Sequence, residues 1–397
     1  MLLSKKSEAI VGSITLAIDA KAKNMLAEGK DVIGFGAGEP DFGTPAHIVK
    51  AGIEALNKGI TRYTPASGTV ELKQAICEKF LNDNGLKYDP SCIVVSNGAK
   101  HSLFNALVAI CNPGDEVILP APYWVSYLEL IKMADAVPVI VQTKEEDNFA
   151  LHIEDVAAAV TSKTKAIILN TPSNPTGSIY TKDQLEQVAK LAVEKDFIVI
   201  SDEIYESLIY DGEQHVSIAT FGEEIKERTI IVNGLSKSCA MTGWRIGYTA
   251  SNKKIATIMG NYQSHATSNP NSIAQYASIA ALRGSKEELN KMVEEFSNRR
   301  KVMVDKVNSI EGLHANMPKG AFYVFVNISG IFDKFCGDVV IDSAMTFTEQ
   351  LLEKQLTAVV PGEAFGTKDY IRLSYATSMQ NIEKGLDRIK SFVSSLK

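Results

Sequence analysis

Three apolar runs of the chain lead into polar residues that could take part in catalysis. Residues 198–201 (IVIS) lead into Asp202, and Tyr205 follows three positions later. Residues 167–169 lead into a turn-rich segment that contains Asn174, and residues 229–232 lead towards Lys237. At strand ends, a carboxylate and an amine can act as acid, base or nucleophile, and an amide can donate or accept a hydrogen bond. Taken singly, each also has a structural interpretation as a helix N-cap, a turn or a solvated surface residue.

Two glycine-containing segments imitate nucleotide-binding loops but lack required residues. Residues 34–39 (GFGAGE) have Glu39 where the dinucleotide fingerprint needs glycine, and Pro40 follows instead of a helix start. Residues 233–238 (NGLSKS) lack the glycine that stands directly before the lysine of a phosphate-binding loop. The six histidines show no ligand spacing, so we expect no metal site. The five cysteines are odd in number and never form a C-x-x-C pair, which is typical of reduced cytosolic thiols.

Short apolar runs alternate with helical patterns between about residues 91 and 250, which predicts an α/β fold. Seven buried strands are expected at 93–96, 116–119, 137–141, 166–169, 197–201, 229–232 and 246–250. Such alternation predicts a mostly parallel seven-stranded sheet between helices. In sheets of this kind, ligands bind beyond the carboxyl ends of the strands, where Asp202, Asn174 and Lys237 stand.

The pattern changes after residue 286, which predicts a second and smaller α+β domain. A long charged helix is expected at about 286–309. Two or three strands follow, at 321–328, 357–360 and 371–375, with a helix between the first two and a closing helix after the last. With 397 residues, the chain exceeds the usual size of one core. We expect a large domain at 46–285, a small domain at 286–397, and an N-terminal segment, 1–45, that packs with the small domain.

Composition and charge exclude several classes of protein. The chain is 45% hydrophobic and 22% charged, and its net charge of −6 comes without a basic block. Disorder and nucleic-acid binding are therefore not expected. Residues 1–10 have no apolar signal region, and no run of uncharged apolar residues is long enough for a membrane span. We expect a cytoplasmic protein with no membrane partner.

Residues 234–247 (GLSKSCAMTGWRIG) resemble the lysine signature of the class I aminotransferases, which carry pyridoxal phosphate on fold type I. Other segments resemble this family in the same order along the chain: 37–42 (AGEPDF), 62–65 (RYTP), 97–100 (NGAK), 122–127 (PYWVSY), 173–177 (SNPTG), 201–205 (SDEIY) and 371–376 (IRLSYA). Among its branches, the chain looks most like bacterial aspartate aminotransferases of the Bacillus type.

The resemblance implies a catalytic centre around the cofactor ring. Lys237 would form the aldimine with the cofactor aldehyde and later move the proton at the substrate α-carbon. Asp202 would pair with the pyridine nitrogen and keep it protonated. Asn174 and Tyr205 would donate hydrogen bonds to the ring 3-oxygen, and Trp124 would stack on the ring face.

The resemblance also implies a phosphate cradle at a helix start. The backbone amides of Gly98, Ala99 and Lys100 would bind the cofactor phosphate, because a helix N-terminus favours an anion. Ser236 and Arg245 would close this cradle.

Substrate binding and assembly follow from the same resemblance. Arg372 would hold the substrate α-carboxylate as a bidentate fork, and Gly38 would approach the same group through its backbone N–H. Trp124 and Asn174 would also contact the substrate. Tyr63 is expected to reach the cofactor phosphate of a neighbouring subunit, which implies a homodimer with shared active sites.

The implied reaction is transamination between an amino acid, aspartate above all, and 2-oxoglutarate by a ping-pong mechanism. The same core residues would serve an aminotransferase for aromatic amino acids, alanine or prephenate, or a β-eliminating lyase. A regulator that kept the fold is the alternative of a different class. Some relatives place a lysine or polar residue near the positions of Val11 and Val108. Neither position is polar here, so the preference for a dicarboxylic substrate follows from the resemblance alone.

Overall fold

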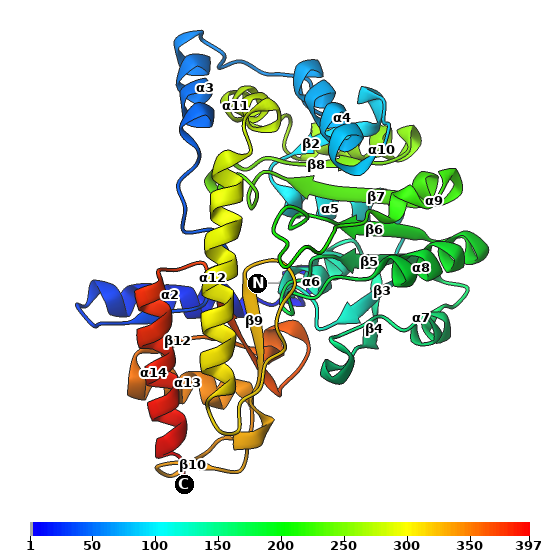
Figure 1. Cartoon of the computed structure of the whole chain (residues 1–397). Helices are drawn as coiled ribbons and strands as arrows, with labels where there is room; N and C mark the ends of the chain where they lie inside the picture. The colour runs from blue at the N-terminus through cyan, green and yellow to red at the C-terminus, as the bar shows by residue number, and fades with distance from the viewer. Residues whose placement is uncertain (1–2) are drawn as a thin grey trace.

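The computed structural model describes residues 3–397, and its largest unit is a seven-stranded sheet with helices on both faces (Figure 1). The strands lie in the order β2 (Ile93–Ser96), β8 (Gly247–Ala250), β7 (Thr229–Gly234), β6 (Ile198–Asp202), β5 (Thr164–Asn170), β3 (Glu116–Ala121) and β4 (Val137–Gln142). β8 is antiparallel to both of its neighbours, and all other neighbouring pairs are parallel. The seven predicted strands and the mostly parallel sheet are confirmed.

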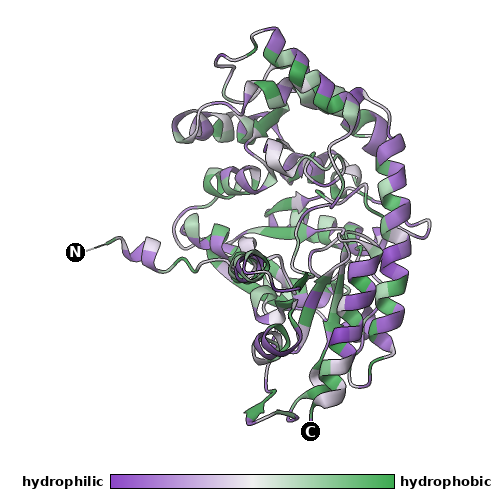
Figure 2. Ribbon diagram, turned by 90° about the vertical axis from the view of Figure 1, so that its left-hand side faces the viewer, coloured by the Kyte–Doolittle hydropathy of each residue, from purple (hydrophilic) through white to green (hydrophobic). Residues whose placement is uncertain are grey.

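Both faces of this sheet are buried, which explains why its strands are apolar throughout rather than alternating. On β6, Ile200 packs into the core on one face and Val199 into the core on the other. Figure 2 shows the hydrophobic strands between helices of mixed colour. The helices of this unit are α3 (Ala46–Asn57), α4 (Val70–Asn84), α5 (Ala99–Ile110), α6 (Val125–Met133), α7 (Ile153–Ala159), α8 (Lys182–Lys195), α9 (Glu223–Arg228), α10 (Lys253–Ala266) and α11 (Ser272–Arg283).

The remaining C-terminal chain builds a second unit around a three-stranded antiparallel sheet, β13-β14-β9. The elements of this unit are α12 (Glu287–Asn308), β9 (Tyr323–Asn327), β10 (Phe335–Cys336), β11 (Val339–Val340), α13 (Ala344–Gln355), β12 (Thr357–Ala358), β13 (Val360–Pro361), β14 (Tyr370–Ser374) and α14 (Met379–Ser395). Helix α12 runs from the large sheet down to this unit in Figure 1. The strand predicted at 357–360 is divided into two. β12 pairs with β1 (Ile33–Gly34), whereas β13 pairs with β14.

The N-terminal chain contains α1 (Lys5–Glu8), α2 (Ile14–Ala27) and β1 (Ile33–Gly34). β1 pairs in parallel with β12, which belongs to the second unit. The sequence pattern did not predict α2, although Ser13 caps it by accepting a hydrogen bond from the Leu16 amide at 3.4 Å.

The longest helix, α12, has 22 residues and carries many charges. Within residues 3–397, no helix is long and apolar enough to cross a membrane.

Candidate active site

Three neighbouring parallel strands end side by side at one edge of the large sheet. β5, β6 and β7 are adjacent and end at Asn170, Asp202 and Gly234. Asn174 and Lys237 follow within a few residues of two of these ends. This edge is where open α/β sheets bind their ligands.

Asp202 is a buried carboxylate held by two donors. The Tyr127 hydroxyl donates to its Oδ2 at 2.7 Å, and the Ile204 amide donates to its Oδ1 at 3.2 Å. Burial raises the pKa of Asp202 to about 6, although both hydrogen bonds oppose this rise. A cation brought beside this carboxylate would therefore be strongly bound, because it would offset the cost of burying the charge.

Lys237 lies among aromatic rings and backbone at the same edge. Its Nζ donates a hydrogen bond to the Gly38 carbonyl oxygen, and it lies 5.6 Å from the ring centre of Phe322 and 5.9 Å from that of Tyr205. This contact uses the carbonyl of Gly38, whereas the role that the resemblance implies for Gly38 concerns its N–H. A Cβ at Gly38 would lie 3.8 Å from the Tyr323 hydroxyl, so the protein itself does not require glycine there.

The amine of Lys237 is easier to deprotonate than an ordinary lysine. Burial, together with the charges of Arg372 and Arg245, lowers its pKa to about 8, although the charges of Glu39 and Asp202 oppose this change. At neutral pH a usable fraction of this amine is a free base, which is the form that attacks a carbonyl or removes a proton.

Arg372 is a buried guanidinium whose protein partners are all neutral. Its Nη1 donates to Asn174 Oδ1 at 2.9 Å and its Nη2 donates to the Gly36 carbonyl at 3.1 Å. Its Nε is buried and has no hydrogen-bond partner among residues 3–397. The guanidinium carbon lies 4.3 Å from the ring centre of Tyr323 and 5.0 Å from that of Phe365. A buried cation with an unused donor is suited to a carboxylate ligand.

Tyr205 and Asn174 contact two residues that lie against each other, Tyr323 and Arg372. The Tyr205 hydroxyl shares a hydrogen bond of 3.0 Å with the Tyr323 hydroxyl. Since Asn174 uses its Oδ1 for Arg372, its side-chain N–H groups are left as donors. Both residues can therefore donate to an oxygen of a ligand near Lys237.

The start of α5 and Arg245 form a second place that favours an anion. The amides of Ala99 and Lys100 are the first two of the helix, and within residues 3–397 they have no acceptor. Arg245 donates only to carbonyl oxygens, at 2.9 Å to Thr242 and 3.3 Å to Asn97. Gly98 has φ +89°, and a Cβ there would lie 2.3 Å from Arg245 Nη2, so only glycine allows this approach.

Trp124 lies between this helix start and Asp202. Its ring packs edge-on against Tyr127 with centroids 5.2 Å apart, and Lys100 Nζ lies 5.0 Å from the Trp124 ring centre. The Lys100 side chain thus faces the tryptophan, in addition to the role expected for its amide. Ser236 is buried in the turn after β7, one residue before Lys237.

Within residues 3–397, no hydrogen bond joins the Tyr63 side chain to the other expected site residues. Its side chain is 90% exposed, and it lies in the loop between α3 and α4.

Two site residues were not predicted. Tyr127 stands three positions after Trp124, and this spacing on one helix face was the available signal that it would point the same way. Tyr323 begins β9, and nothing in its apolar surroundings marked it as a site residue.

The residues present fit pyridoxal phosphate. Arg245 and the free amides at the start of α5 suit a phosphate, Asp202 suits a protonated ring nitrogen, and Lys237 is an amine with a lowered pKa.

Comparisons with known proteins point to one family. Residues 30–389 match the model of the family "Aminotransferase class I and II". The aspartate aminotransferase of Bacillus subtilis is 48% identical over 393 residues, which cover 99% of both chains. The aspartate/prephenate aminotransferase of Nitrosomonas europaea is 44% identical and covers 99% of this chain and 100% of its own. The crystal structure of the Rhizobium meliloti aspartate aminotransferase has a TM-score of 0.96 at 41% identity, with full coverage of both chains. The chain belongs to the class I and II aminotransferase family.

Proposed function

We propose that this protein is a pyridoxal-phosphate-dependent aminotransferase that exchanges the amino group between aspartate and 2-oxoglutarate. The observation that carries the proposal is the buried Arg372, with neutral partners and an unused Nε, in the same site as the partly deprotonated Lys237. Aspartate as the substrate is supported by relatives of that name at 47–48% identity over nearly the whole chain.

The roles of the residues follow from these positions. When bound, the cofactor supplies a carbonyl for the amine and an electron-accepting ring. Arg372 binds the substrate α-carboxylate, and Asn174 orients the guanidinium. Lys237 Nζ would take up the proton of the substrate α-carbon and release it again. Asp202 would hold a protonated ring nitrogen, and Tyr205 would donate to a ring oxygen.

The test is covalent capture followed by a substrate panel. Purified protein loaded with pyridoxal phosphate is reduced with borohydride, and the modified peptide is identified by mass spectrometry. We expect the label on Lys237 and on no other lysine. Single amino acids are then mixed with loaded protein, and we expect the cofactor spectrum to change fastest with aspartate. Release of pyruvate and ammonia from a β-substituted substrate would instead indicate a lyase.

We also propose that the active unit is a homodimer in which Tyr63 reaches the partner's cofactor phosphate. The exposure of Tyr63 supports this. So does α3, which leaves large apolar side chains uncovered in the single chain, namely Val49, Ile53 and Leu56. Sedimentation of the loaded protein tests the assembly, and we expect twice the 43.2 kDa of one chain.

The domain limits and the location of the protein belong to the same proposal. We place the cofactor-binding domain at 46–285 and the small domain at 286–397, with 1–45 packing on the latter. The pairing of β1 with β12 supports this division. The five cysteines are all unpaired, which supports a reducing compartment, the cytoplasm.

A further inference from the structure

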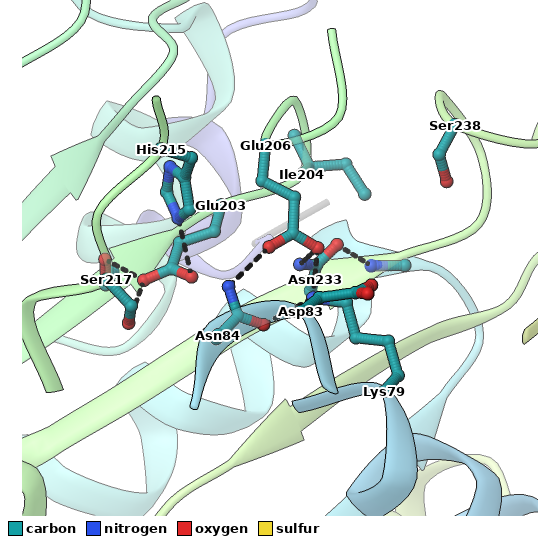
Figure 3. Close-up of polar contacts among 12 residues, drawn as sticks. Lys79, Asp83, Asn84, Glu203, Ile204, Glu206, His215, Ser217, Asn233 and Ser238 are labelled. Atoms are coloured by element: carbon teal, nitrogen blue, oxygen red, sulfur yellow. Dashed lines mark hydrogen bonds and ion pairs between the residues drawn. The ribbon is translucent and has the colours of Figure 1, made fainter. Parts of the chain in front are cut away.

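A second group of buried charges lies on the opposite side of the turn that carries Asp202 and Tyr205. We call it the anchor network, and it consists of Lys79, Asn84, Glu203, Glu206, His215, Ser217 and Asn233 (Figure 3). Asp202 and Tyr205 take part in the contacts of the candidate active site. Glu203 and Glu206, each one residue further along, point into the anchor network instead.

The carboxylate oxygens of the network already have protein partners, and His215 Nδ1 is a buried atom of the network without a partner among residues 3–397. Glu203, Glu206 and His215 offer ligand atoms within 4.8 Å of one another. However, Glu203 Oε1 already accepts from Ser201 at 2.9 Å and from Ser217 at 2.7 Å, and its Oε2 is 3.0 Å from His215 Nε2. The ammonium of Lys79 is paired with Glu206 at the place that a cation would take. We therefore assign these residues an ion-paired structural role.

Glu206 is the centre of this network. Its Oε1 is paired with Lys79 Nζ and accepts from Asn233 Nδ2 at 2.7 Å, and its Oε2 accepts from Asn84 Nδ2 at 3.0 Å. Burial alone would raise the pKa of Glu206, but the charges of Lys79 and His215 and the hydrogen bonds lower it to about 2. The carboxylate is thus ionised at every working pH and is a strong acceptor.

Asn233 connects this centre to the segment that carries Lys237. It is the penultimate residue of β7, and its Oδ1 accepts from the Gly234 amide at 2.7 Å. Lys237 follows four residues after Asn233. A backbone bond of 2.9 Å from the Glu203 amide to the Val232 carbonyl joins the same two segments. Glu206 therefore holds the end of β7 against the turn after β6.

We propose, on the basis of the proposed function, that Glu206 is a positioning residue that acts through Asn233. Its hydrogen bond to Asn233 keeps the Lys237 segment in register with the turn that presents Asp202 and Tyr205. A cavity of about 60 Å³, lined by Lys79, Glu206 and Asn233 among others, lies beside this bond and has room for about two waters. If the bond is lost, water can enter and the segment is free to shift.

The test separates the hydrogen bond from the charge. In a Lys79→Met background, Glu206→Gln (the Met/Gln variant) keeps an acceptor for Asn233, whereas Glu206→Leu (the Met/Leu variant) removes it. Neither double variant has a buried unpaired charge. Asn233→Ala in the natural background breaks the same link and leaves the Lys79–Glu206 pair intact. Ile389→Ala, in the buried face of α14, is the control for loss of stability alone.

The first readout needs no cofactor. The amine of Lys237 in cofactor-free protein is acylated over a range of pH, and its labelling is followed by mass spectrometry. Glu39, Asp202, Arg245 and Arg372 are the charged groups that face this amine, and all four are unchanged in every variant. We expect a midpoint near pH 8 in the natural protein, in the Met/Gln variant and in Ile389→Ala. In the Met/Leu variant and in Asn233→Ala, we expect a rise of about one pH unit, because the amine becomes hydrated.

The second readout is the dissociation constant for pyridoxal phosphate. We expect it to be about tenfold larger in the Met/Leu variant and in Asn233→Ala, but unchanged in the Met/Gln variant. Midpoints that stay together in all variants, or that move equally in Ile389→Ala, would overturn the proposal. If the Met/Leu variant does not fold, Asn233→Ala decides alone. Failure of the natural protein to take up the cofactor would refute the proposed function, whereas the labelling midpoints still decide the role of Glu206.

Discussion

Asp202→Asn should stabilise the cofactor-free protein while it slows catalysis. Asp202 is 3% exposed, and burial raises its pKa to about 6 from the usual 3.8. A folded-state pKa above the unfolded value means that the neutral acid favours folding. This contribution is fully present below about pH 3.8 and is lost as the pH rises through 6.

The magnitude follows from the two pKa values. The difference between about 6 and 3.8 corresponds to about 3 kcal/mol of unfolding free energy above pH 7. The hydrogen bonds from Tyr127 and the Ile204 amide are already included, because they oppose the rise of the pKa. Asparagine resembles the protonated acid at every pH. The variant should therefore be more stable by about 3 kcal/mol at pH 8 and by about half as much at pH 5.

The assay is urea unfolding of cofactor-free protein at pH 5 and pH 8. Asp387→Asn is the control, because Asp387 pairs with Lys306 at the surface and its loss should change stability by less than about 1 kcal/mol. With cofactor and aspartate present, Asp202→Asn should slow the half-reaction about thirtyfold or more, since an amide cannot keep the ring nitrogen protonated. An advantage for the variant that is absent at pH 8, or equal at both pH values, would refute the reasoning.

Further predictions concern the contacts around Asp202, the substrate carboxylate and the dimer. Tyr127→Phe removes the 2.7 Å bond to Asp202 and should shift the acid limb of the half-reaction upwards by about one pH unit, as measured in a pH–rate profile, whereas Tyr123→Phe should not. Arg372→Lys should raise KM for aspartate and alanine alike, because lysine lacks the bidentate fork; a change for aspartate alone would mean that Arg372 binds the side chain. Tyr63→Leu and Lys237→Ala protomers, mixed and co-refolded at limiting cofactor, should regain about a quarter of the natural sites. With confirmed subunit exchange, no gain over the separate variants would place Tyr63 at its own chain's site.

The sequence predicted the elements and the strand-end residues because both depend on local pattern. A strand buried on both faces is a short apolar run, and its end is visible where polar residues begin, as at Asp202 and after residue 169. The long charged helix α12 was predicted within a residue or two of its ends for the same reason. The resemblance to a known family then supplied the roles that pattern alone left open.

The contacts that hold the site residues could not be predicted from the sequence. Tyr127 and Asp202 are 75 residues apart, and Asn84 and Glu206 are 122 residues apart. Nothing local distinguishes Glu206 from a surface acid, because its partner Lys79 lies in α4, far from Glu206 along the chain. Pairing of this kind is decided by which helix covers which strand end, and that information resides in tertiary packing.

The charges of the site together describe what it binds. The anion-binding groups of the site have only neutral partners or none. Arg245 and the first amides of α5 form one place for an anion, and the buried Arg372 forms a second. Asp202 is a buried carboxylate whose pKa is raised by burial, so it suits a cationic partner. A ligand that satisfies all three must present an anion, a cation and a second anion. Pyridoxal phosphate with an amino-acid substrate presents them as phosphate, ring nitrogen and α-carboxylate. Burial of the Asp202 carboxylate therefore lowers the stability of the cofactor-free protein, and under the proposed function the same carboxylate would hold the ring nitrogen of the cofactor.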